Sequence, residues 1–218
     1  MKIISTDLAR AIMLFPIIEL NSKGLSLKNV FLDFSQRYSF QNFPKHGQDL
    51  DNEKALTFEN GNFITEDGRS IAIKMRIVSD GFVADCWSST DDAQAFLDDA
   101  MGWLNTEHGL CLPDDRIAKK TYLSQLIVTT SKKLASISQN LEAFSSVLSK
   151  KAIEAKEADS EFSLGSVGFW SNDPAKKLIF RFENQVGTKP SEKRFFTSGP
   201  FSTKLHIQLL EEFERILG

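Results

Sequence analysis

Three histidines, His46, His108 and His206, are the only imidazole side chains in the 218-residue sequence. A site that uses histidine as a general base, as Ser-His-Asp and Cys-His enzymes do, must therefore use one of them. His108 lies three residues before Cys111 and close to two aspartates, a grouping that could suggest a metal site. Because no second ligand pair at zinc spacing occurs elsewhere, we expect no metal there and no cofactor.

Gly165-Ser166-Val167-Gly168 has the Gly-x-x-Gly form of a loop that grips a nucleic-acid backbone. Such a loop joins two helices and carries basic residues, whereas this one lies inside a predicted strand, so we interpret it as a bulge or a close backbone approach. The sequence has no dinucleotide-binding glycine motif, no phosphate-binding loop that ends in Lys-Ser or Lys-Thr, and no Gly-x-Ser-x-Gly elbow. It therefore nominates no catalytic residue and favours a protein that is not an enzyme.

Acidic and basic side chains are concentrated in different stretches, which the net charge of −3 hides. Nine carboxylates and no lysine or arginine occur between Asp80 and Asp115, while lysine and arginine predominate between Ala175 and Leu205. We interpret each stretch as a solvated face; the alternative is complementary patches for association, or a basic face for an anionic partner. The residues of this anion-binding alternative are Lys176, Lys177 and Arg181.

Two adjacent aromatic residues, Phe195 and Phe196, fall in a predicted loop before the last helix. Because two neighbours in a loop do not easily enter the core together, we expect one to pack under the helix and the other to contact a partner. Lys189, Lys193 and Arg194 lie in the same loop. These five residues form the predicted partner-binding site; the alternative is that the loop covers an edge strand.

The first half of the chain has the pattern of a β-meander closed by a helix. Apolar residues alternate with polar residues from Ile71 to Val78, which predicts a half-buried strand, and Asp80-Gly81 predicts the hairpin turn after it. Thr90 is the predicted N-cap of the helix that follows, and Gly109 is its predicted stop. Upstream, residues 10–20 predict a strand, and helical spacing from Leu27 to Tyr38 predicts an amphipathic helix.

The second half repeats this order of elements. Residues 122–130 predict a strand, and residues 162–186 predict a hairpin. A last helix begins after a cap at Ser202 or Thr203. Between the first strand and the hairpin, residues 134–155 predict the longest helix of the chain, with a buried stripe at steps of three and four. The members of this stripe are Leu134, Ile137, Leu141, Phe144 and Leu148.

The order strand, helix, strands, helix in both halves predicts an α+β fold. We expect a mostly antiparallel sheet, or two related sheets, with helices packed on one face and an internal duplication of a β-α-β-β-α unit. The predicted halves are residues 1–110 and 119–218, packed together as one compact unit. The halves share the order of their elements and not their residue identities.

The length and the cysteine content place further bounds on the protein. A chain of 218 residues buries enough apolar surface to fold without disulfides, and its two cysteines have no framework spacing, so we expect a reducing compartment. The apolar stretch from Ala11 to Leu20 contains Pro16 and is too short to span a bilayer, which needs about 20 residues. We therefore expect a cytoplasmic protein without membrane contact.

Two functions follow from these observations. The first is a non-catalytic protein-interaction or structural protein that assembles with itself, as a homo-oligomer, or with another protein. The alternative is binding of nucleic acid or another anionic ligand through the basic face of the second half.

Overall fold

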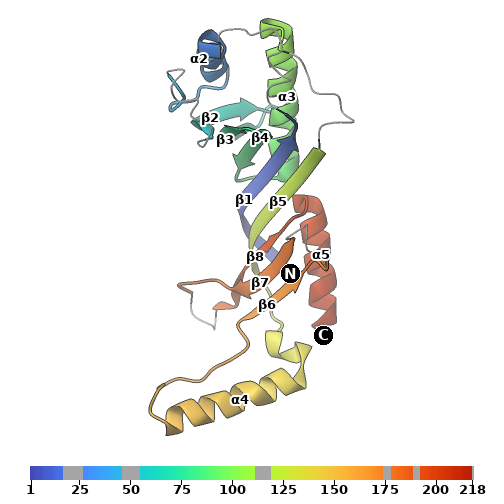
Figure 1. Cartoon of the computed structure of the whole chain (residues 1–218). Coiled ribbons are helices and arrows are strands. Elements are labelled where there is room, and N and C mark those ends of the chain that lie inside the picture. Colours follow the sequence, from blue (N-terminus) through green and yellow to red (C-terminus); the bar gives the residue numbers. More distant parts are fainter. Residues whose placement is uncertain (17–26, 46–54, 111–118, 174–177, 189–191, 218) are drawn as a thin grey trace. The chain divides into compact units, whose positions relative to one another are not determined.

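The computed structural model describes residues 1–16, 27–45, 55–110, 119–173, 178–188 and 192–217. Over these residues the fold is α+β, as predicted: an eight-stranded antiparallel sheet with four α-helices and one 3-10 helix (Figure 1). The chain divides into two compact units. We call Thr6–Ser124 with Pro200–Thr203 the N unit, and Met1–Ser5 with Gln125–Gly199 and Lys204–Gly218 the C unit.

Each half of the chain contributes one helix after its first strand, then three strands, then a second helix. The hydrogen-bonded order of the strands is β2-β3-β4-β1-β5-β8-β7-β6. The first half comprises β1 (Lys2–Leu14), α2 (Leu27–Arg37), β2 (Leu56–Ile64), β3 (Ser70–Val78), β4 (Gly81–Cys86) and α3 (Thr90–His108). The second half comprises β5 (Lys119–Thr129), η2 (Leu134–Ile137), α4 (Gln139–Glu154), β6 (Ser166–Trp170), β7 (Ile179–Asn184), β8 (Arg194–Gly199) and α5 (Thr203–Ile216).

Aromatic side chains fill the core of the N unit. The ring of Phe34, on α2, lies 5.2 Å from that of Phe58 on β2, and it also contacts Tyr38 and Trp103. Phe96, on α3, is fully buried, and its ring contacts those of Phe34 and Tyr38. The predicted apolar faces of both helices therefore pack on one face of the meander, because alternate strand residues present their side chains to that face.

The predicted hairpin between β3 and β4 is confirmed; Ser79 and Asp80 form its turn, and Gly81 is the first residue of β4. Gly81 has φ 146°, a conformation that L-residues with side chains avoid. It pairs with Leu14 across the β1–β4 ladder, and a Cβ placed on Gly81 would lie 2.0 Å from the carbonyl oxygen of Met13. Glycine is therefore required there by conformation and by space.

The core of the C unit is smaller. Leu126 and Val128 from β5, Phe182 from β7 and Leu210 from α5 are fully buried together. His206 is also fully buried on α5, whereas Leu205 and Ile216 are exposed. The buried face of α5 therefore contains a histidine as well as Leu210.

The helix after β5 differs most from its prediction. Leu134 and Ile137 form a separate 3-10 helix, η2, so α4 has 16 residues and α3, with 19, is longer. The prediction that the stripe of α4 is buried was wrong, because within α4 only Ser149 is buried. Each half has three strands between its helices rather than two, and the internal duplication stays a prediction.

No helix among the described residues combines the length and the apolar character that crossing a bilayer requires.

Candidate interaction surfaces

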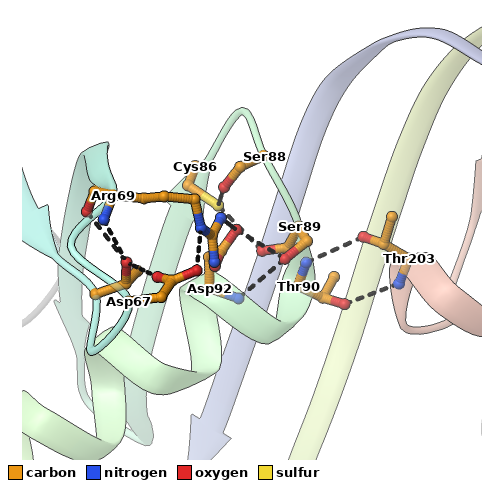
Figure 2. Close-up of polar contacts among 9 residues, drawn as sticks. Asp67, Arg69, Cys86, Ser88, Ser89, Thr90, Asp92 and Thr203 are labelled. Atoms are coloured by element: carbon orange, nitrogen blue, oxygen red, sulfur yellow. Dashed lines mark hydrogen bonds and ion pairs between the residues drawn. The ribbon is translucent and has the colours of Figure 1, made fainter.

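A polar network surrounds the first turn of α3 (Figure 2). Ser89, and not the predicted Thr90, is the N-cap, and its Oγ accepts a hydrogen bond from the backbone N–H of Asp92 at 3.1 Å. Ser89 Oγ also donates to the Asp92 carboxylate at 2.9 Å. From the start of β3, the Arg69 guanidinium donates to both carboxylate oxygens, at 2.9 and 3.3 Å. Asp92 thus joins the sheet to the start of the helix.

The environment of Asp92 favours its ionised form. Burial by itself would raise the pKa of this carboxyl, but hydrogen bonds from Arg69, Ser88 and Ser89 outweigh burial and hold the pKa below its usual range. The positive end of the α3 dipole acts in the same direction. The same contacts raise the pKa of Arg69, which also donates to Asp67 at 2.8 Å. The network is therefore a charged cap on α3.

Thr90 and Thr203 form a reciprocal pair of hydrogen bonds inside the N unit (Figure 2). The Thr90 N–H donates to Thr203 Oγ1 at 3.0 Å, and the Thr203 N–H donates to Thr90 Oγ1 at 2.8 Å. Both threonines begin helices, whose first N–H groups have no partner within the helix. The pair thus satisfies two backbone donors that would otherwise be buried without an acceptor.

This network lacks the components of a nucleophilic site. Cys86 is fully buried, and its thiol donates to the carbonyl of Ser89 at 3.2 Å. His108 lies beside Trp103 and 3.6 Å from an Asp33 oxygen. In the part of the chain that the structure describes, no group of three or more His, Cys, Asp or Glu side chains could hold a metal.

Of the other residues considered for a histidine-based or metal site, only His206 lies among the described residues. His206 Nε2 lies 2.9 Å from Thr197 Oγ1 in the C-unit core, where its imidazole joins α5 to β8. His46 and Cys111 lie outside the described residues. Of the described histidines, His206 therefore hydrogen-bonds within the C-unit core, and His108 packs against Trp103.

An acidic groove of about 670 Å³ runs beside this cap, between the β2–β3 turn and α3. Four of its six carboxylates have cationic partners: Asp98 pairs with Lys120, Asp99 with Arg37, and both Asp67 and Asp92 with Arg69. No buried polar atom that lacks a partner lines it, among the residues described. We therefore assign it no ligand. The carboxylates that line it are Glu66, Asp67, Asp91, Asp92, Asp98 and Asp99.

The structure places Phe195 and Phe196 in β8, so the prediction of a loop was wrong. Phe195 is 6% exposed and stacks on Phe182 with ring centroids 4.7 Å apart, while Phe196 points to the other face and is half-buried. Neighbouring strand residues alternate between faces, which allows two adjacent phenylalanines to be accommodated without a loop. In this conformation Phe195 belongs to the core and has no surface to offer a partner.

Three of the predicted basic residues, Lys193, Arg194 and Arg181, lie among the described residues. Lys193 and Arg194 are exposed; Lys193 Nζ donates to the carbonyl of Ser131, and Arg194 lies 3.6 Å from Glu192. Arg181 is exposed on β7, opposite Ser198. Lys176, Lys177 and Lys189 lie outside the described residues.

The surface whose exposure the sequence patterns did not predict is the apolar stripe of α4, which we define as Leu141, Phe144 and Leu148. Their exposed fractions are 44%, 61% and 39%. At 100° per residue they lie within an arc of about 60°. Ser149 points elsewhere and exchanges hydrogen bonds with the backbone of Phe162, at 2.8 and 3.4 Å. The spacing predicted an apolar face on this helix correctly, but the prediction that the face is buried was wrong.

The steps of three and four within the stripe are those of the a and d positions of a coiled coil. Flanking side chains in this pattern are uncharged at Asn140, Ser145 and Val147. The next position of the seam is Lys151. An uncharged border and one cation at the C-terminal end therefore define the chemistry of this surface.

No protein-family model matches the chain, and a search of curated proteins finds no match.

Proposed function

We propose that this chain is a non-catalytic protein-interaction protein and that the apolar stripe of α4 binds its partner. The observation that carries the proposal is the exposure of Leu141, Phe144 and Leu148 on one face of a helix whose only buried residue is Ser149. Folded proteins rarely leave a contiguous apolar face in water unless the face is used for binding.

The spacing of the stripe favours a helix as the bound element. Side chains at steps of three and four fill the gaps between residues of a second helix. Two parallel copies of α4 would bring Lys151 beside Lys151 of the other copy, and this repulsion disfavours parallel self-pairing. We therefore propose a helix of another protein, with apolar residues along the stripe and a carboxylate that faces Lys151.

Site-specific photo-cross-linking tests the proposal. A photo-reactive phenylalanine analogue replaces Phe144 in the full chain, and the same analogue at Ser146 serves as the control. Ser146 is exposed and lies about 160° around the helix from Phe144. We expect one protein to be captured from position 144 in the native host and not from position 146.

Purified proteins then give the quantitative test. We expect Leu141→Ser to weaken binding of the captured protein at least about tenfold, and Ser146→Ala to leave it unchanged. Capture of only a second copy of this chain would refute the assignment of a different protein as partner. Equal capture at both positions, or no capture, would refute the α4 surface itself.

The alternative, binding of an anionic ligand, has less support among the described residues. Arg181 and Arg194 lie on one face of β7 and β8, since Arg181 is opposite Ser198 and Gln185 bonds to Arg194. Glu183 lies between them on that face and reduces its attraction for phosphates. A salt-independent affinity for nucleic acid, or none, would exclude this alternative.

A further inference from the structure

β6 is the outermost strand in the order β8-β7-β6. Edge strands expose unpaired N–H and C=O groups, and proteins protect them with charged residues, proline or a covering segment. β6 has the sequence Ser-Val-Gly-Phe-Trp, which contains no charge and no proline. Phe169 and Trp170 are 55% and 67% exposed. Within the described ranges, no strand pairs with the outer edge of β6.

The hydrogen bonds to β7 show which backbone N–H and C=O groups of β6 do not point towards β7. Gly165 O accepts from Asn184 N at 2.8 Å, and the N–H of Ser171 donates to Leu178 O at 2.9 Å. Odd-numbered residues of this segment therefore direct their N–H and C=O groups towards β7, because these directions alternate along an antiparallel strand. The N–H and C=O groups of Ser166, Gly168 and Trp170 point to the free edge.

We propose that β6 pairs antiparallel with β6 of a second copy of this chain, across a two-fold axis at Gly168. In this register Gly168 lies opposite Gly168 of the second copy, and Ser166 lies opposite its Trp170. All the outward groups then exchange hydrogen bonds in three reciprocal pairs. Every residue of β6 is paired in this register. A shift by one residue along either strand would place outward groups opposite inward ones.

The side chains match in the same register. Val167 lies opposite Phe169 of the second copy at a non-hydrogen-bonded position, where side chains approach most closely. The Trp170 ring already lies over Gly168 within one chain, since a Cβ on Gly168 would be 3.1 Å from it. Gly168 therefore leaves room for two indole rings, one from each copy, on one face of the joined sheet. No charge opposes a like charge across the axis.

This self-pairing uses a surface other than α4 and does not depend on the proposed function. Sedimentation velocity of the full chain over the micromolar range measures it directly. We expect a reversible monomer–dimer equilibrium. Gly168→Lys places two lysines opposite each other at the axis, and we expect it to weaken the dimer at least about tenfold. Gly168→Glu has the same effect, and a mixture of the two variants restores dimers as heterodimers.

Control variants distinguish a loss of dimerisation at the β6 edge from a loss with another cause. Val186→Lys adds the same charge at a residue that is 95% exposed and outside β6, so dimerisation remains unchanged. Ser166→Pro removes an outward N–H at the first residue of the strand, where proline is tolerated, and it weakens the dimer without disturbing the β6–β7 ladder. This second variant provides the test if substitution at Gly168 impairs folding.

Three results would overturn the proposal. The first is a wild-type chain that stays monomeric throughout the series. The second is a dimer that persists in folded Gly168→Lys or Ser166→Pro protein. The third is failure of the Gly168→Lys and Gly168→Glu proteins to associate when mixed, since the register at Gly168 requires their charges to meet. Phe144→Ser leaves the dimer intact, which distinguishes this edge from the α4 stripe.

Discussion

Replacement of Asp92 by asparagine tests whether the charged cap of α3 stabilises the N unit. The Asp92 carboxylate is buried, accepts from Arg69 and Ser89, and lies in the first turn of α3. Hydrogen bonds to a charged group contribute about 1.5–3 kcal/mol, and a favourable charge at a helix N-terminus contributes about 0.3–1 kcal/mol. Arg69 is about half exposed, so we expect the loss of stability to lie near the lower end of the sum of these two contributions.

We expect Asp92→Asn to reduce the free energy of unfolding by about 2 kcal/mol at pH 7, because asparagine keeps the shape and loses the charge. For a chain of this length that loss lowers Tm by about 4–8 °C. Thermal unfolding followed by tryptophan fluorescence measures the change. Asp91→Asn is the control, since Asp91 is exposed in the same turn and no hydrogen bond from Arg69 reaches it in the described contacts.

The pH dependence has a definite sign. The pKa of Asp92 is lowered in the folded state, so its stabilisation is fully present above the unfolded value near 3.9 and is lost as pH falls through the folded pKa. The difference in Tm between wild type and Asp92→Asn should therefore shrink below about pH 4. A difference that persists unchanged in acid, or one no larger than that of Asp91→Asn, would refute the electrostatic explanation.

Four further substitutions test the packing. Gly81→Ala should destabilise the chain by more than about 2 kcal/mol in a urea titration, since its Cβ would overlap the Met13 carbonyl at a positive φ. Gly102→Ala should instead stabilise the chain by about 0.5–1 kcal/mol in that titration, because Gly102 has open space around it in α3. Phe96→Ala should cost about 3–5 kcal/mol, and a smaller loss in that titration would contradict the packed core. Phe144→Ser should change stability by less than about 0.5 kcal/mol, because its ring is largely exposed; a larger loss would mean that α4 packs against its own chain.

Local spacing was sufficient to predict most of the fold. The alternation from Ile71 to Val78 and the Asp80-Gly81 turn predict β3, β4 and the turn that joins them, because strand period and left-handed glycine are properties of a few consecutive residues. The end of α3 at Gly109, with φ 63°, is likewise a property of a few consecutive residues. The predicted loop at Phe195 failed because β8 is short and its alternation is masked by two adjacent aromatics.

The use of an apolar face depends on the tertiary structure. The steps from Leu141 to Leu148 determine that α4 has a stripe, but they contain no information on what covers it, and in the fold nothing described does. His206 is similar: only the position of Thr197 across the core explains a buried imidazole. The edge position of β6 depends on the pairing of strands far apart in the sequence. Periodicity therefore determines which faces are apolar, and long-range packing determines which of them remain available for a partner.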